Sequence, residues 1–380
     1  MELTMSKRDG NKARQETRAV KRKILLSDKT LSSDDKVRVL LSELDSLKGE
    51  LRDARSESLT TSYAKTKIFE LSEGKLIAPS WMISKRNSSS KTLGIPTIFA
   101  SDWHYGEKVF ASQIEGINSF DLAIADLRIQ ALVNNSLDIL FNHLSNPKYD
   151  GLVFPLGGDM FSGNIHEELA NTNEDEMLPC VIRLTGRLYW AIKVFADHFG
   201  KVHVPVVTGN HGRTTRKPIH KNRVYSNYDW LLGCMLAREF KDDPRVTFQI
   251  SDGTDCQYSI YNHRYSLTHG DQFSGGGDIA GAIVPVLRGD AKKRNREGQI
   301  NKTYDTLICG HFHQLVVTKK AIINGSLKGY DEYAYAHNFP YEPPQQAMWL
   351  THPEHGITFC MPIFLDEKKK DVKYKLPITF

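Results

Sequence analysis

The chain has 380 residues, of which 40% are hydrophobic and 25% are charged, a balance typical of a globular protein with a sizeable core. Its net charge of +5 does not by itself indicate nucleic-acid binding, and no run of about 18 apolar residues predicts a membrane span. The five cysteines stand singly, and residues 1–15 lack the apolar stretch of a secretory signal. We therefore expect a cytoplasmic protein whose cysteines are reduced and packed as small apolar side chains.

The first part of the chain is predicted to be an extension of the main domain. Residues 1–30 are polar and basic, which favours a flexible arm. Between residues 32 and 55, a 3-4-3-4 spacing of aliphatic side chains predicts an amphipathic helix with Val37, Leu40, Leu44, Leu47 and Leu51 on one face. This helix either packs on its own protein or mediates self-association or binding of a partner protein. We thus expect a basic arm and helix over 1–60, a lead-in linker over 61–94 and the main domain over 95–380.

Beyond the linker, short strand-like runs alternate with longer helical stretches. Five runs rich in β-branched and aromatic residues end in polar clusters: TIFASDWH, GLVFPLGGD, VHVPVVTGNHG, YSLTHGD and TLICGHFH. Helical periodicity covers about 120–146, 175–199 and 227–241. The segments RVTFQI, CQYSIYNHRYSLTHG, KKAIINGSL, AMWLTHP and GITFCMPIFL favour antiparallel strands or hairpins. This alternation predicts an α/β fold with a buried, two-layered or mixed sheet.

Each of the five polar clusters supplies a side chain that can bind a metal, at the end of a strand where ligands of open α/β sheets lie. These residues are Asp102, His104, Asp159, Asn210, His269, His311 and His313. Asp102 and His104 are two residues apart, as are His311 and His313, and in an extended chain this spacing aims both side chains to one side. Carboxylate, amide and imidazole ligands without thiolate suit Mn²⁺, Fe²⁺ or Zn²⁺ rather than a structural zinc site.

In this order, the motifs D-x-H, G-D, G-N-H, H and G-H-x-H resemble those of the calcineurin-like metallophosphoesterases over about residues 97–330. The resemblance implies a β-sandwich of two mixed sheets flanked by helices, here with an N-terminal helical extension. It also implies two divalent ions, with Mn²⁺ expected first and Fe²⁺, Zn²⁺ or Mg²⁺ as alternatives. One ion would be held by Asp102, His104, Asp159 and His313. The other would be held by Asp159, Asn210, His269 and His311, so that Asp159 bridges the two.

The resemblance leaves His211 free to act on the substrate. Two neighbouring ions can polarise a phosphate and activate the attacking water, so no separate general base is needed. His211 would then protonate the leaving oxygen or hold the phosphoryl group. Gly212 stands where an acidic residue commonly follows the G-N-H motif, which leaves the orientation of His211 open. The next residue, Arg213, is a candidate to contact a phosphate.

Other departures from the family bear on the substrate. Its protein phosphatases carry G-D-x-x-D-R, whereas G-D-M-F-S-G stands here, which argues against a protein phosphatase. The segment L-G-G-D-M-F is similar to the G-G-D-x-F of SbcD-type DNA-repair nucleases. Residues 213–223 hold five basic residues and no acid, and residues 288–302 are also basic. Two basic loops suit a polynucleotide backbone, although such runs are as often solvated loop surface.

We therefore expect a two-metal phosphodiesterase acting on nucleic acid, first of all a DNA nuclease. A phosphomonoesterase or small-nucleotide phosphodiesterase of the same family is the alternative, because the metal centre is shared. A non-catalytic scaffold subunit is less well supported, since such relatives are expected to lose ligands and all seven positions are filled here. An aromatic-rich stretch over residues 330–341 either stacks bases or anchors a loop.

Overall fold

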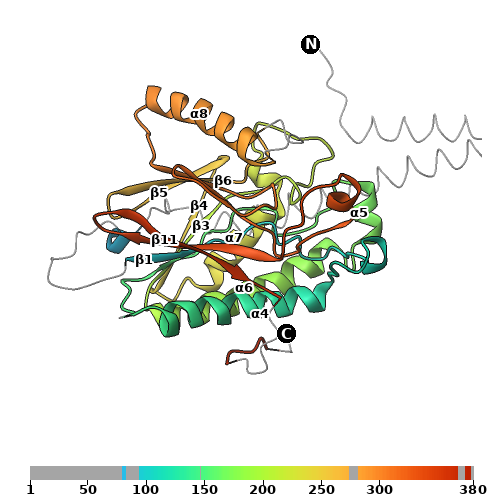
Figure 1. The fold of residues 1–380 in the computed structure, drawn as a ribbon, viewed down its shortest axis with the longest axis horizontal. Coiled ribbons are helices and arrows are strands. Elements are labelled where there is room, and N and C mark those ends of the chain that lie inside the picture. Colours follow the sequence, from blue (N-terminus) through green and yellow to red (C-terminus); the bar gives the residue numbers. More distant parts are fainter. Residues whose placement is uncertain (1–78, 83–93, 146, 274–280, 367–372, 378–380) are drawn as a thin grey trace, which may run out of the picture. The chain divides into compact units, whose positions relative to one another are not determined.

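The computed structural model describes residues 79–82, 94–145, 147–273, 281–366 and 373–377 (Figure 1). The predicted basic arm and the predicted amphipathic helix between residues 32 and 55 lie outside these residues, as does most of the predicted linker. The boundaries at residues 60 and 94 therefore stay predictions.

Two mixed sheets form the centre of the domain. The first has the strand order β11-β10-β1-β2-β3-β4, and the second has the order β5-β6-β7-β9-β8. The strands of the first sheet are β1 (Ile95–Ile98), β2 (Leu152–Val153), β3 (Val202–Val206), β4 (Val246–Ile250), β10 (Gln345–His352) and β11 (Gly356–Phe364). Those of the second are β5 (Asp255–Ile260), β6 (His263–Thr268), β7 (Thr306–Cys309), β8 (Val316–Val317) and β9 (Ala321–Ile323).

Within the first sheet, β1 to β4 run parallel to one another, and β10 pairs antiparallel with both β1 and β11. In the second sheet, β5 and β6 form an antiparallel hairpin, β6, β7 and β9 run parallel, and β8 pairs antiparallel with β9. The five runs with polar ends thus belong to β1, β2, β3, β6 and β7, all of which are parallel to a neighbour.

The helices begin and end at residues suited to those positions. They are α4 (Leu122–Asp138), α5 (Glu167–Thr172), α6 (Met177–Phe199), α7 (Tyr228–Glu239), α8 (Ile283–Gln299) and α9 (Glu332–Ala336). Short helical turns occupy Ser80–Met82, Ala111–Gln113 and Val224–Ser226, and a wider turn, Ile139–His143, continues α4. The carboxylate of Asp121 accepts the N–H of Ile124 at 2.7 Å and so caps α4. Gly200, at φ 70°, ends α6 in the left-handed conformation that glycine adopts without strain.

The domain has four layers, helix–sheet–sheet–helix. Helices α4 and α6 lie along one side of the first sheet, and α8 lies beyond β5 and β6 (Figure 1). One cluster of buried apolar side chains joins α4, α6 and α7 to the first sheet, and another joins α8 to the second. Between the sheets, Trp349 packs against Phe99 and Tyr265, with ring centroids 6.2 and 6.0 Å apart. Each such side chain contributes about 1.5–3 kcal/mol on burial.

The predicted α/β class, with two mixed sheets flanked by helices, is confirmed. The helices predicted near 120–146, 175–199 and 227–241 are present as α4, α6 and α7. The prediction that RVTFQI is an antiparallel strand is wrong, because β4 pairs parallel with β3. The intervening helix α7 makes the crossover that a parallel connection requires. KKAIINGSL was likewise expected to be antiparallel, but β9 is antiparallel only to β8 and runs parallel to β7.

Across the described residues, the structure contains no helix with the length and apolar character needed to cross a bilayer. The five cysteines all lie in this part of the chain and all are free thiols. Four are buried and Cys360 is half-buried, which agrees with their expected role as small apolar side chains.

Candidate metal centre

The loops that follow β1, β2, β3, β6 and β7 meet at one place because hydrogen bonds join them, some between backbones and some between a backbone and a side chain. The N–H groups of Asp102 and His104 donate to the carbonyls of Gly158 and Asp159, each at 3.1 Å. The N–H of Gly310 donates to the carbonyl of His269 at 2.8 Å. Residues far apart in sequence are thereby fixed side by side at the carboxyl ends of the strands, as the sequence predicted.

Three groups of side chains in this region have metal-ligating atoms that all lie within 4.8 Å of one another. The groups are Asp102, His104 and His313, then Asp159, His269 and His311, and between them His104, Asp159 and His211. All six predicted histidine and carboxylate ligands are therefore brought together, in two separate clusters that the third group joins through His104 and Asp159. The seventh, Asn210, places Oδ1 3.2 Å from Nε2 of His269, beside the second group.

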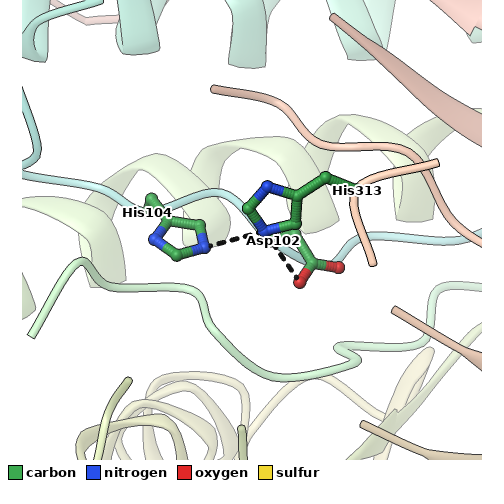
Figure 2. Close-up of side chains that lie close together, drawn as sticks. All are labelled: Asp102, His104 and His313. Atoms are coloured by element: carbon green, nitrogen blue, oxygen red, sulfur yellow. Dashed lines mark hydrogen bonds and ion pairs between the residues drawn. The ribbon is translucent and has the colours of Figure 1, made fainter. Parts of the chain in front are cut away.

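Figure 2 shows the first group, in which two imidazoles and one carboxylate converge. Nε2 of His104 lies 3.1 Å from Nε2 of His313, which in turn lies 3.5 Å from Oδ1 of Asp102. The Asp102 carboxylate is fixed by two further donors, the N–H of His311 at 2.9 Å and the Ser101 hydroxyl at 2.6 Å. Asp102 and His104 are buried, whereas the side chain of His313 is 28% exposed, so the group opens to solvent on one side.

The second group contains a histidine whose surroundings call for a cation. Nδ1 of His269 lies 2.9 Å from the carbonyl oxygen of Gly157, so this nitrogen must carry the proton and donate it. Nε2 then faces two acceptor oxygens, Oδ2 of Asp159 at 2.9 Å and Oδ1 of Asn210 at 3.2 Å. In a neutral imidazole, the lone pair of Nε2 would point at both oxygens and be repelled by them. Either a second proton or a metal ion has to lie between them, which is the donor set expected of a metal position.

The ionisation of these side chains agrees with metal binding. Burial lowers the pKa of His104 and of His311 to about 4, and lowers the pKa of His313 well below its usual range. These imidazoles are therefore neutral at pH 7, as ligands must be. Burial alone would also lower the pKa of His269, but the neighbouring Asp159 carboxylate raises it to about 10. Burial raises the pKa of Asp102 to about 7, so this carboxylate lacks a sufficient countercharge from the protein.

The ligand-bearing backbone is not extended. Five of the seven residues have positive φ: Asp102 at 57°, His104 at 48°, Asp159 at 50°, His311 at 71° and His313 at 55°. The prediction that a two-residue spacing in extended chain aims the paired side chains to one side is therefore wrong in its reasoning. The side chains converge because the chain turns through the left-handed region at alternate residues. That conformation costs a non-glycine residue about 1–3 kcal/mol and is typical of functional sites.

A buried carboxylate and a glycine explain how the Asp159 loop keeps its place. Asp229 is buried at the start of α7 and accepts the N–H groups of Asp159, Met160 and Gly209 at 3.1, 3.1 and 2.8 Å. The sequence gives little signal for this role, since an acidic residue in a first helical turn is usually explained by the helix dipole. Gly158, at φ 87°, passes so close to the backbone of Gly209 that a Cβ would collide with it.

The predicted substrate-facing residues lie beside these groups. Nδ1 of His211 lies 2.8 Å from the Ser162 carbonyl, to which it donates, and this contact defines the ring orientation that the sequence left open. The His211 and His104 rings are 4.6 Å apart. A further histidine, His166, lies 5.6 Å from the His211 ring and is exposed. The sequence offered no spacing from which a role for His166 could be predicted.

Arg213 lies in the wall of a pocket beside Asn210. The pocket is lined by Gly209, Asn210, Arg213, Thr215, Pro218, Ile219, Arg223, Asn227 and Asp271. Arg213 is held by two backbone carbonyls, those of Asn210 at 3.1 Å and Thr215 at 3.2 Å, and pairs with no carboxylate among the described residues. Arg223 instead pairs with Asp271 at 2.7 Å. The guanidinium of Arg213 is therefore available to an anion.

The aromatic stretch over residues 330–341 is largely at the surface. Tyr330 is buried, whereas Tyr333 is 64% exposed and Tyr341 is 55% exposed. Loop anchoring therefore accounts for Tyr330, while base stacking by the exposed rings stays a prediction. Asn324 and Ser326, which follow β9, have a structural role, because they hydrogen-bond to the loop that carries Asp102.

Comparison with known proteins gives similarity at the level of solved structures only. No family model matches the chain, and no curated protein sequence matches it. Zinc-bound Vps29 from Entamoeba histolytica matches with 13% identity and a TM-score of 0.29, covering 72% of this chain and 100% of that one. Vacuolar protein sorting 29 from Cryptosporidium parvum matches with 14% identity and a TM-score of 0.28, covering 67% of this chain and 84% of that one. A predicted phosphoesterase from Streptococcus pneumoniae matches with 10% identity and a TM-score of 0.26, covering 70% of this chain and 96% of that one. Similarity this low does not assign the chain to a family.

Proposed function

We propose that this protein is a metal-dependent phosphoesterase with two divalent ions, expected to be Mn²⁺, with Fe²⁺, Zn²⁺ and Mg²⁺ as alternatives. The observation that carries the proposal is a pair of ligand groups, Asp102 with His104 and His313 and Asp159 with His269 and His311, joined by a third group that contains His104, Asp159 and His211. Asp102, His104, Asp159 and His313 would hold one ion. Asp159, Asn210, His269 and His311 would hold the other. Ions at these positions would supply Lewis acidity toward a phosphoryl group and an attacking water.

His211 is proposed to donate the proton that the leaving oxygen requires. Its Nδ1 is committed to the Ser162 carbonyl, so Nε2 is the nitrogen that can exchange a proton with a substrate. The N–H of His211 also donates to Oδ1 of Asp159 at 2.7 Å, which ties its position to that of the bridging carboxylate. Arg213 is proposed to bind a phosphate oxygen, because its guanidinium is oriented by backbone carbonyls and has no carboxylate partner among the described residues.

For the substrate we propose a phosphodiester of nucleic acid, DNA first. Support comes from the basic loop over residues 213–223, which reaches the candidate centre at Arg213, and from the G-G-D-M-F segment that resembles SbcD-type nucleases. A phosphomonoester or small nucleotide is the second candidate. The pocket supports it, because Pro218 and Ile219 add an apolar wall beside Arg213, whose charge has no carboxylate partner among the described residues. A non-catalytic scaffold is the third, and the complete ligand set argues against it.

The test is an activity screen of the full chain after chelation and reloading with Mn²⁺, Fe²⁺, Zn²⁺ or Mg²⁺. Substrates are single- and double-stranded DNA, RNA, a cyclic dinucleotide and an aryl phosphate. We expect Mn²⁺-stimulated cleavage of DNA that is abolished by Asp159→Asn, which removes a ligand of both ions. Turnover of monoesters or small nucleotides alone would favour the second candidate. Hydrolysis of no substrate under any metal would refute the proposed function.

Two further proposals concern location and partners. A cytoplasmic location and association through residues 32–55 are both expected from the sequence. Light scattering of the full chain and of a variant lacking residues 1–60 measures the second directly. The same number of chains per particle in the full chain and the shortened variant would contradict self-association through this segment.

A further inference from the structure

Behind the His104 ring lies a buried network of ionic side chains that the proposed reaction does not itself use. Oε2 of Glu107 lies 3.0 Å from Nδ1 of His104. The other oxygen, Oε1, lies 2.8 Å from Nζ of Lys328, and Nζ also lies 2.5 Å from Oδ2 of Asp331. The side chains of Glu107, Lys328 and Asp331 are only 6%, 3% and 10% exposed.

Packing alone does not explain this network. Removing charges from water is costly, and apolar residues of similar size often stabilise a protein as much as a buried ion pair does. Burial alone would lower the pKa of Lys328, but Asp331 and Glu107 raise it above its usual range, so the ammonium stays charged. One cation thus faces two carboxylates, and a net negative charge is left beside the imidazole of His104.

The two candidate metal positions differ in what lies behind their buried histidines. Nδ1 of His104 faces the carboxylate of Glu107, whereas Nδ1 of His269 donates to the neutral carbonyl of Gly157. A carboxylate accepting from one ring nitrogen fixes the tautomer and makes the opposite nitrogen a stronger metal donor than a peptide carbonyl does. For His104 the opposite nitrogen is Nε2, which points at His313 (Figure 2).

We propose that Glu107, anchored by Lys328, is a positioning residue that orients His104 and strengthens it as a ligand at one of the two metal positions only. The inference rests on the proposed function. Lys328 holds Oε1 of Glu107 and leaves Oε2 for His104. Lys328, which follows β9, thereby affects how strongly His104, which follows β1, can bind a metal. The position formed with His269 does not depend on this network.

The test compares two substitutions that change the network equally. Glu107→Gln and Asp331→Asn each remove one negative charge and leave Lys328 one carboxylate partner. Of the two substituted residues, only Glu107 contacts His104. Asp331 also caps α9 by accepting the N–H of Ala334 at 2.7 Å, and the amide oxygen introduced by Asp331→Asn can accept the same N–H, so α9 keeps its start.

Co²⁺ serves as the probe, because its visible absorption reports each site, and affinities are measured by calorimetric titration of the full chain. We expect the wild-type chain to bind two Co²⁺ ions. Glu107→Gln should weaken one of them about 10- to 100-fold and change its absorption, with the other unaffected. Asp331→Asn should leave both affinities within about twofold of the wild-type values, because Glu107 keeps its contact with His104.

Equal weakening in both variants, or unchanged binding in Glu107→Gln, overturns the inference while the proposed function stands. A wild-type chain that binds no Co²⁺ overturns the proposed function and the inference together. Glu107→Asp is the second variant, should the glutamine form not fold. Its shorter carboxylate cannot span His104 and Lys328 at once, so it too should weaken a single site, and undiminished binding would count against the inference.

Discussion

Replacement of Gly310 by alanine tests whether the Asp102 carboxylate is fixed where the structure places it. A Cβ at this position would overlap Oδ2 of Asp102 and lie 2.6 Å from the Ser101 hydroxyl. The carboxylate cannot move freely, because the N–H of His311 and the Ser101 hydroxyl hold its two oxygens at 2.9 and 2.6 Å. Relief of the overlap therefore requires a shift of about 1 Å in a metal-ligand candidate, far more than the tolerance of about 0.5 Å of such sites.

The expected losses follow from that shift. Overpacking of this kind costs about 1–3 kcal/mol in the free energy of unfolding. A misplacement of about 1 Å in a reacting constellation lowers turnover about 100-fold. Metal content should fall at the position that Asp102 shares with His104 and His313, since Asp102 contributes nothing to the second group.

The assay combines urea unfolding of the chelated protein, metal content after reloading, and turnover of whichever phosphoester the screen identifies. Gly298→Ala is the matched control, because a Cβ at this position of α8 meets nothing within 4 Å. That change should stabilise the protein by about 0.4–1 kcal/mol and leave metal content alone. Full metal content and turnover in Gly310→Ala would show that the Asp102 carboxylate does not occupy the place described.

Three further predictions concern the proton donor, a buried histidine and the N-terminal extension. His211→Asn should lower turnover at least about 100-fold while metal content, measured on the same sample, stays at the wild-type level; loss of metal instead would place His211 among the ligands. His203 is buried on β3, and burial lowers its pKa to about 4, so its protonation favours the unfolded chain. Stability should therefore fall as pH drops from about 6.5 to about 4, by about 3 kcal/mol in all, and His203→Gln should reduce this slope in urea titrations; identical slopes would contradict the assignment. Deletion of residues 1–60 should weaken DNA binding and its dependence on salt while hydrolysis of a small aryl phosphate continues, and loss of that hydrolysis would make the segment part of the catalytic domain.

The convergence of the metal-competent side chains could be predicted from the sequence because it is encoded locally. Each follows a strand-like run, and carboxyl ends of parallel strands lie at one edge of a sheet. The helices could be predicted equally well, since the spacing of their apolar residues lies within single segments of the sequence. The parallel direction of β4 could also have been inferred, because α7 supplies the length of chain that a parallel crossover needs.

Other parts of the site depend on contacts that no local pattern reveals. Lys328 lies 221 residues from Glu107, and neither residue belongs to a recognisable motif. Asp229 acts on the Asp159 loop from 70 residues away. The positive φ of Asp102 and His313 could not be predicted either. A non-glycine residue adopts left-handed backbone because tertiary contacts impose it, and not because the residue itself favours it.

The pairing of β1 with β10 has a consequence for the order in which the molecule can be built during synthesis. Residues 345–352 complete the sheet beside β1, and the side chain of Gln346 accepts the N–H of Ser101 at 3.0 Å and the indole N–H of Trp103 at 3.1 Å. The loop that carries Asp102 and His104 therefore has no complete support until that late strand has left the ribosome. Because domains fold as units, the nascent chain carries the sequence of the centre long before it can assemble it.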